Sequence, residues 1–168
     1  MLFRSIAADS VEQFSELILA KSFPAGIRRV RQHRALGHRT VLITGALDFV
    51  VEPFRPLFDD IVSAKLGVVD GTYDGRMTAV PPTGEARYQA LVDHAAAHDM
   101  DLRESVAYAD SASDLPMLEA VGFPVAVNPE TRLASIARKR GWLVEDFRKS
   151  PGMRRSLLPL APARSAAR

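Results

Sequence analysis

The stretch Val106-Ala-Tyr-Ala-Asp110-Ser-Ala-Ser-Asp114-Leu-Pro-Met-Leu118 decides the fold of this chain. Its first four residues are apolar on both faces, a pattern typical of a buried parallel strand. Asp110 then falls at the carboxyl end of that strand, where open α/β sheets bind their ligands. Asp114 directly precedes Leu115-Pro116, and proline is favoured in the first turn of a helix. The stretch therefore predicts a strand, a ligand-binding loop and a helix.

The two carboxylates of this loop suit a hard cation. Mg²⁺ prefers oxygen ligands and is commonly held together with a phosphate. Asp110 is therefore a candidate metal ligand, and Asp114 is a candidate to hold the metal or to orient its waters. Ser111 is a candidate donor behind them. The spacing alone leaves a second interpretation open, in which Asp110 is a turn residue and Asp114 a helix cap.

Composition narrows the class of protein. With 168 residues, 47% of them hydrophobic and 25% charged, the chain fits one globular domain. A net charge of only +2, with no basic stripe among aromatic residues, argues against a nucleic-acid partner. The sequence has no cysteine, which is typical of a cytoplasmic protein, and we expect that location. No apolar run approaches the roughly 18 residues of a membrane span, so we expect no membrane partner.

Helical and extended patterns alternate along the chain. Helices are predicted at Ser10–Lys21, Ala25–Leu36, Phe49–Leu57, Gly84–His98, Pro116–Ala120 and Glu130–Arg140. Strands are predicted at Thr40–Ile43, Asp60–Leu66, Val106–Ala109 and Pro124–Val127. The turn residues Asp70–Gly75 predict an antiparallel hairpin between Lys65–Val69 and Arg76–Val80. This alternation favours an α/β fold with a parallel sheet and right-handed crossovers.

Two segments resemble motifs of one family. Tyr108 to Leu118, followed by Gly122-Phe-Pro-Val-Ala-Val-Asn128-Pro129, resembles the fourth motif of the haloacid-dehalogenase-like (HAD) phosphohydrolases, in the subfamily that includes phosphoserine phosphatases. Val41-Leu-Ile-Thr44-Gly45-Ala46 resembles their second motif, an apolar strand that ends in Ser or Thr. The resemblance runs from about Ala25 to Phe147. It implies a Rossmann-like sheet with flanking helices.

The resemblance also implies a reaction and its cofactor. In that family an aspartate attacks the phosphorus of a phosphomonoester, and water then hydrolyses the aspartyl-phosphate. A small phosphorylated metabolite as substrate and Mg²⁺ as cofactor follow from the likeness, with Asp110 and Asp114 at the metal. The hydroxyl of Thr44 and the backbone N–H of Gly45 would hold a phosphoryl oxygen, and Asn128 would assist substrate binding. The alternative for Thr44 is a plain threonine between a strand and a turn.

The position of the family's third motif carries an unexpected residue. In the family, a lysine near the start of the helix that corresponds to Gly84–His98 balances the charge of the phosphoryl group. Here Glu85 stands at that place, and a carboxylate would repel phosphate. Arg87 is the candidate replacement, because arginine binds phosphate well. A solvated helix face is the alternative for Arg87, and Lys65 is a weaker replacement.

The family's nucleophile motif, an apolar strand reading Asp-x-Asp before the second motif, is absent. The acidic residues before Thr44 are Asp9, Glu12 and Glu16, and Asp9 has the pattern of a helix N-cap. We therefore expect a HAD fold without its first strand. Residues 1–24 would be a partial helical cap, 25–149 the HAD-like core and 150–168 a disordered tail. The unpaired edges of strands 41–43 and 106–109 would favour self-association.

Three interpretations of the whole chain stay open. The chain is a truncated phosphatase that is weakly active or inactive, or it is a non-catalytic HAD remnant that acts as a binding module. The third interpretation is the C-terminal HAD part of a reductase fusion protein. It rests on the resemblance of Trp142–Phe147 and Leu157–Leu160 to the ends of HAD domains fused behind reductase modules.

The remaining charged and histidine residues are expected at the surface. His94 and His98 are four positions apart on a predicted helix, a spacing that zinc accepts. No third ligand motif accompanies them, so an exposed helix face is the expectation. The same expectation holds for Asp59-Asp60 and for the arginines of the helix that begins at Ala25, namely Arg28, Arg29, Arg31 and Arg34.

Overall fold

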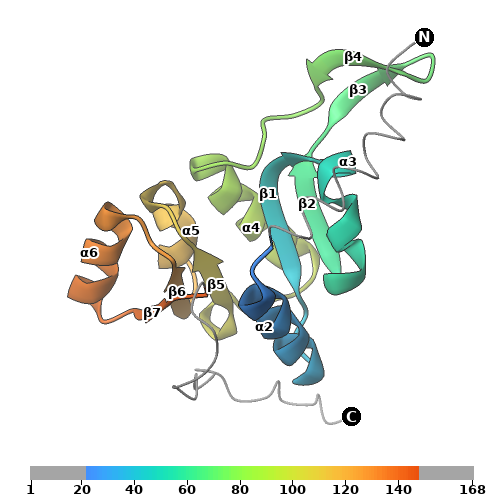
Figure 1. Ribbon diagram of the computed structural model, residues 1–168. Coiled ribbons are helices and arrows are strands. Elements are labelled where there is room, and N and C mark those ends of the chain that lie inside the picture. Colours follow the sequence, from blue (N-terminus) through green and yellow to red (C-terminus); the bar gives the residue numbers. More distant parts are fainter. Residues whose placement is uncertain (1–21, 148–168) are drawn as a thin grey trace.

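The computed structural model describes residues 22–147 (Figure 1). The predicted helix Ser10–Lys21, Asp9, the segment 1–21 of the expected cap and the tail 150–168 lie outside this range. None of the helices within residues 22–147 is both long and apolar enough to cross a membrane.

Two parallel sheets form the centre of the described structure. In the first, β1 (Val41–Leu47) pairs with β2 (Asp60–Ala64). In the second, β5 (Val106–Ala109), β6 (Phe123–Val127) and β7 (Leu143–Glu145) pair in that order. Short helices and 3-10 turns join successive strands: α3 (Asp48–Val51), η1 (Glu52–Leu57), η3 (Ala112–Asp114), α5 (Leu115–Glu119) and α6 (Thr131–Arg140). The α/β architecture predicted from the sequence is confirmed.

The tightest part of the core belongs to the second sheet. Leu118 of α5, Val125 of β6 and Leu133 of α6 are fully buried. Trp142, just before β7, packs against this core, and the guanidinium of Arg140 lies 5.1 Å from its ring centroid. Helix and strand patterns of the predicted kind produce this packing, because α5 and α6 each turn apolar residues toward one core cluster that includes Ala107 of β5 and Ala126 of β6.

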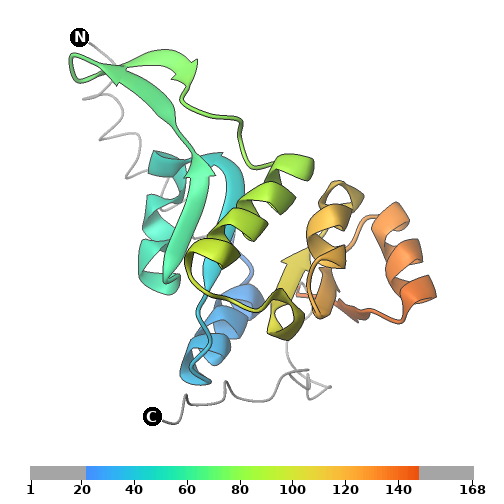
Figure 2. The same cartoon turned by 180° about the vertical axis from the view of Figure 1, so that it is seen from behind.

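A cavity of about 830 Å³ separates the two sheets. Its walls include Val41–Ile43 of β1 and Val106–Tyr108 of β5. Each of these strands is the edge of its own sheet, and they do not pair with one another within residues 22–147. Residues of α2 (Pro24–Ala35) and α4 (Glu85–Ala97) also line it, and the two helices lie on opposite sides of the space between the sheets (Figures 1 and 2).

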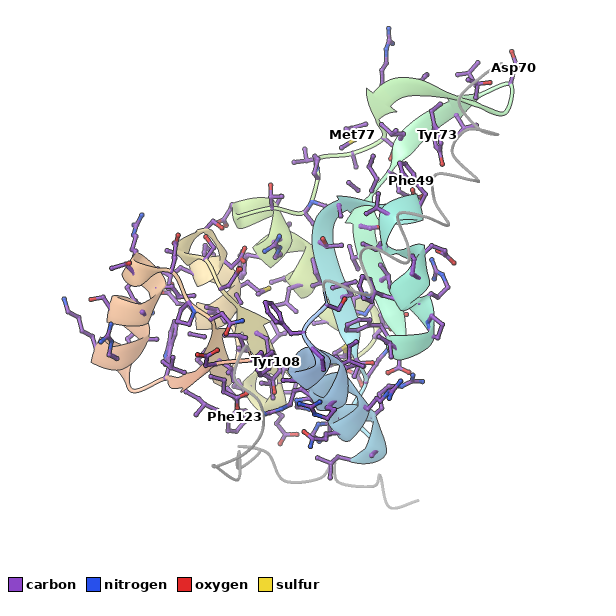
Figure 3. All side chains as sticks on the ribbon, viewed as in Figure 1. Phe49, Asp70, Tyr73, Met77, Tyr108 and Phe123 are labelled. Atoms are coloured by element: carbon purple, nitrogen blue, oxygen red, sulfur yellow. The ribbon has the colours of Figure 1, made fainter. Side chains whose placement is uncertain are left out.

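The predicted hairpin is present, with a shorter turn than expected. It consists of β3 (Leu66–Val69) and β4 (Thr72–Met77), joined by Asp70-Gly71 alone. Both turn residues have positive φ, +49° and +76°, as a two-residue hairpin turn requires. The second Asp-Gly pair, Asp74-Gly75, lies inside β4 where the register shifts, so the prediction of a turn over Asp70–Gly75 is wrong. The ring of Tyr73 contacts Phe49 of α3, with centroids 5.6 Å apart (Figure 3).

Strand boundaries also differ from the sequence prediction, and one strand was missed. β1 does not end at Ile43 but continues to Leu47, because pairing with β2 resumes at Leu47 after an irregularity. The strand predicted over Asp60–Leu66 ends at Ala64, and Leu66 begins β3. β7 was not predicted, because Leu143 and Val144 are exposed and the strand is too short to show a pattern.

Several residues expected at the solvated surface form hydrogen bonds or ion pairs with other parts of the chain. Arg29 of α2 is buried and its Nη2 donates to both carboxylate oxygens of Glu145, at 2.9 and 2.8 Å. Asp59 accepts hydrogen bonds from the backbone and hydroxyl of Thr40, and Asp60 pairs with Arg39 at 2.6 Å. The expectation is wrong for the buried Arg29 and the half-buried Asp60, because their partners lie on other elements, which a sequence pattern does not reveal. Asp59 forms these hydrogen bonds but is exposed, as expected. Arg28 and Arg31 are exposed, as expected.

Candidate active site

Thr44 lies where regular pairing of β1 ends. It is the last residue of the run in register with β2, opposite Ser63, before the irregularity between Thr44 and Leu47. Its hydroxyl accepts a hydrogen bond from the backbone N–H of Ala46, at 3.2 Å. The side chain therefore stands at a turn of the backbone toward the carboxyl end of the first sheet, the end at which α/β folds bind ligands.

The loop before α4 packs directly against this point. A Cβ atom on Gly45 would clash with the methyl group of Thr83, so a glycine is needed for this approach. Gly84, the N-cap of α4, has a φ of +53°, and its Cβ position would be 3.7 Å from the carbonyl oxygen of Ser113. The N-terminus of α4 thus contacts both β1 and the loop after β5. In this structure the methyl group of Thr83 occupies the space that a Cβ atom on Gly45 would need.

Arg87 links α4 to the loop after β5. Its Nη1 lies 2.5 Å from Oδ2 of Asp114, and its Nε donates to the carbonyl oxygen of Pro82 at 3.2 Å. The Asp114 side chain is 3% exposed and that of Arg87 is 21% exposed. The solvated-face interpretation of Arg87 is therefore wrong. The structure brings together two of the residues selected from the sequence, one cationic and one anionic.

Asp114 does not act as a helix cap. It stands at the N-cap position of α5 but makes no side-chain capping hydrogen bond. Its Oδ1 is buried and has no hydrogen-bond partner within the described part of the chain. A buried carboxylate oxygen without a donor costs free energy, on the order of 1–3 kcal/mol. A metal-bound water or another donor from a ligand would satisfy it, so this atom fits the predicted role of Asp114.

Asp110 begins an exposed loop at the carboxyl end of β5. Its backbone carbonyl accepts from the N–H of Glu130, at 2.9 Å, and its side chain is open to solvent. The hydroxyl of Ser111 accepts from the N–H of Ser113, and the carboxylate of Glu130 accepts from the N–H of Ala112 at 2.7 Å. Glu130 is a third carboxylate at this loop that sequence reasoning missed, because it was assigned only to a helix start.

Asn128 is held by the backbone of a neighbouring segment. It adopts a positive φ of +44°, and its Oδ1 accepts from the N–H of Phe147 at 2.9 Å. Its own N–H donates to the carbonyl oxygen of Glu145. The side-chain oxygen therefore binds the segment after β7, and within residues 22–147 no hydrogen bond or ion pair joins Asn128 to Thr44 or to the Arg87–Asp114 pair.

The donor set at this edge fits a hard cation. Asp110 offers an exposed carboxylate, and Asp114 offers a buried carboxylate oxygen that lacks a partner within residues 22–147. Arg87 offsets part of the negative charge. Oxygen ligands without sulfur or imidazole are those that Mg²⁺ prefers.

The chain belongs to the family of haloacid dehalogenase-like hydrolases, whose model matches residues 1–119. It is 36% identical to a phosphoserine phosphatase of Mycobacterium tuberculosis over 129 residues, which cover 77% of this chain and 37% of that protein. It is 31% identical to a histidinol-phosphatase of Neisseria meningitidis over 143 residues, which cover 82% of this chain and 64% of that protein. The chain thus spans between about a third and two thirds of the length of these curated relatives.

Solved structures agree on the fold. A protein with unknown function from Bordetella pertussis matches with a TM-score of 0.79 and 31% sequence identity, covering 86% of this chain and 67% of that chain. A substrate-bound phosphoserine phosphatase matches with a TM-score of 0.56 and 20% identity, covering 72% of this chain and 56% of that chain. The second likeness concerns the fold alone. Together they support the Rossmann-like HAD fold predicted from the sequence.

Proposed function

We propose that this chain carries the phosphate- and magnesium-binding part of a phosphomonoester hydrolase that acts on a small phosphorylated metabolite. The observation that carries the proposal is the convergence of three elements. The end of regular pairing in β1, the N-terminus of α4 and the loop after β5 meet through the Gly45–Thr83 approach and the Arg87–Asp114 ion pair. Family membership and the phosphatase names of two relatives support it. The cysteine-free sequence supports a cytoplasmic location.

Thr44, Gly45 and Arg87 each supply hydrogen-bond donors to the phosphoryl group. The hydroxyl of Thr44 and the N–H of Gly45 donate to one phosphoryl oxygen. The guanidinium of Arg87 has five N–H donors, of which those on Nε and Nη1 face Pro82 and Asp114. The remaining donors attract phosphoryl oxygens. Phosphoryl transfer depends mainly on such positioning and charge neutralisation.

Asp110 and Asp114 would hold Mg²⁺, the first directly and the second directly or through water. When bound, the ion supplies Lewis-acid polarisation of a phosphoryl oxygen. Because Mg²⁺ is usually held by one or two carboxylates plus substrate phosphate, we expect weak binding of the ion alone and tighter binding with phosphate present.

The reaction also needs a nucleophile, and the sequence has no apolar-Asp-x-Asp strand before Thr44. Loss of a covalent nucleophile removes several orders of magnitude of rate. We therefore expect the purified 168-residue chain to hydrolyse p-nitrophenyl phosphate at close to the background rate. Robust Mg²⁺-dependent turnover that Asp9→Asn abolishes would instead identify Asp9 as the nucleophile.

Phosphate binding tests the proposal independently of turnover. Calorimetric titration with inorganic phosphate should give measurable binding in the presence of Mg²⁺ and much weaker binding without it. Asp110→Asn should remove the Mg²⁺ dependence, and because Asp110 is exposed the fold should persist. Thr44→Val should weaken phosphate binding about tenfold, whereas the matched variant Thr44→Ser keeps the hydroxyl and the affinity. Binding that ignores both Mg²⁺ and Thr44→Val would refute the site.

A further inference from the structure

We propose that Asp60, His94 and His98 form a second metal site, with the donor set of a divalent transition metal such as Zn²⁺. The three side chains each offer one ligand atom, and these atoms all lie within 4.8 Å of one another. The site lies apart from the candidate active site. Asp60 is the first residue of β2, at its amino end, whereas Thr44 and Asp110 lie toward the carboxyl ends of their strands.

The helix spacing brings the two imidazoles together. His94 is in the last turn of α4 and His98 is its C-cap residue, so they are four positions apart and share one face. Their ring centroids are 4.3 Å apart. The third ligand that the sequence did not reveal comes from β2, because the C-terminal end of α4 packs near the first residue of that strand. The expectation of a merely exposed histidine face is therefore wrong for His94.

His94 provides the independent observation that points to a ligand. Its side chain is 11% exposed, and Nε2 is a buried atom without a hydrogen-bond partner in the described range. The nearest carboxylate oxygen, Oδ2 of Asp60, is 3.5 Å away, which is too long for a good hydrogen bond. A nitrogen that has lost its water and gained no partner destabilises the fold, and a metal ion bound there would compensate.

The distances suit a site that tightens on binding. Zn–N and Zn–O bonds of about 2.0–2.2 Å place two ligand atoms of a tetrahedral site about 3.3–3.5 Å apart. The His94–Asp60 separation of 3.5 Å already matches this value. All the separations in the cluster are within 4.8 Å, and His98 is exposed, so its side chain has room to rotate. Because His98 faces solvent, a water molecule would be the fourth ligand of the metal.

Two charges act on an ion at this place. The C-terminal end of a helix carries a partial negative charge, so the last turn of α4 favours a cation. Arg39 opposes the binding of a cation, because the Nε of Arg39 donates a hydrogen bond to Oδ2 of Asp60 at 2.6 Å. The arginine side chain is 42% exposed and can leave toward solvent when a metal binds. Competition between Arg39 and the metal gives the proposal a directional test.

The test is calorimetric titration of the full 168-residue chain, freed of metal with a chelator, with ZnCl₂. We expect saturable binding with one ion per chain. His98→Ala should weaken the affinity at least tenfold, and Asp60→Asn should do the same. Asp99→Asn is the matched control: it is the exposed neighbour of His98 with positive φ, which asparagine tolerates, and it should leave the affinity unchanged. Arg39→Gln should strengthen binding about threefold or more, because it removes the competing cation.

A thermal readout separates binding from misfolding. Zn²⁺ should raise the midpoint of unfolding of the wild-type chain and of Asp99→Asn, but not that of His98→Ala. The midpoint of His98→Ala without metal should equal that of the wild type, since His98 is exposed. The proposal is overturned if the wild type shows no saturable Zn²⁺ binding, if His98→Ala and Asp60→Asn retain its affinity, or if Arg39→Gln weakens it.

Discussion

His33 is the residue whose surroundings set its protonation most clearly. It is buried on α2, with Nε2 at 2.7 Å from the hydroxyl of Tyr108 and Nδ1 at 2.9 Å from Nδ1 of His38. Burial, followed by the charges of His38 and Arg29, lowers the pKa of His33 to about 4. Arg29 is itself paired with Glu145. His33 is therefore neutral in the folded protein at neutral pH.

The lowered pKa of His33 predicts acid sensitivity. The unfolded chain binds a proton near pH 6.5 and the folded chain only near pH 4, so protons favour unfolding between these values. The free energy of unfolding should fall by up to roughly 3 kcal/mol as the pH drops from 6.5 to 4. Urea unfolding at several pH values measures this slope. His33→Gln should flatten it, and a slope unchanged in that variant would assign the acid sensitivity to other groups.

Single residues were predictable from the sequence where a local pattern marks them. Asp110 follows the apolar run Val106–Ala109 and Thr44 ends the apolar run that begins at Val41, and both patterns are visible without a structure. The partners of a residue are not visible in this way. Tyr108, which meets His33, lies 75 positions away, and Asp60 lies on a different element from His94. The same limit explains why Arg87 was selected without its ion pair to Asp114.

At the scale of elements, one buried ion pair fastens α2 to β7. The Arg29 and Glu145 side chains are 8% and 11% exposed, and the guanidinium contacts both carboxylate oxygens. A buried pair of this kind is costly to break from one side, because the remaining charge keeps its burial and loses its counter-ion.

Arg29→Met should therefore lower the free energy of unfolding by about 3–5 kcal/mol. Adding Glu145→Leu should recover part of the loss, since the double variant leaves no buried charge behind. Denaturation by urea, with the wild type, both single variants and the double variant, measures the coupling. Costs that simply add in the double variant would show that the two side chains stabilise the fold separately.

Helices were predicted accurately where the hydrophobic periodicity extends over many residues. The helices near Ala25–Leu36 and Gly84–His98 were found to within a residue or two, because twelve or more residues carry the pattern. The hairpin shows the opposite case. Asp70-Gly71 and Asp74-Gly75 have the same turn chemistry, and only the pairing of Val69 with Thr72 determines which one becomes the turn. β7 has three residues and no periodicity to detect.

At the scale of the whole molecule, the separation of the two sheets governs stability. β1 and β5 each present an edge to the cavity between them. Backbone groups that are buried without a partner cost about 1–3 kcal/mol each, against a typical total stability of about 5–15 kcal/mol. Exposed strand edges pair readily with another chain. The sequence predicted these two strands and both helices, but only the structure shows that α2 and α4 line the space between the strands.

We therefore expect the 168-residue chain to be marginally stable or to self-associate when it is produced alone. Sedimentation velocity over a range of concentrations measures the association, and circular dichroism measures the thermal transition. A monomer with one cooperative transition above about 60 °C, beyond much of the usual mesophile range, would contradict this expectation.

The position of Trp142 makes the two halves of the molecule optically distinguishable. It is the single tryptophan of the sequence, and it packs against the core formed by α5, β6 and α6. Its fluorescence therefore follows only the half that contains β5, β6 and β7, whereas far-ultraviolet dichroism averages over both sheets. If the two signals change at the same denaturant concentration, α2 and α4 couple the sheets into one cooperative unit. If the dichroism changes first, the β1–β2 half melts while the tryptophan still rests in a folded core.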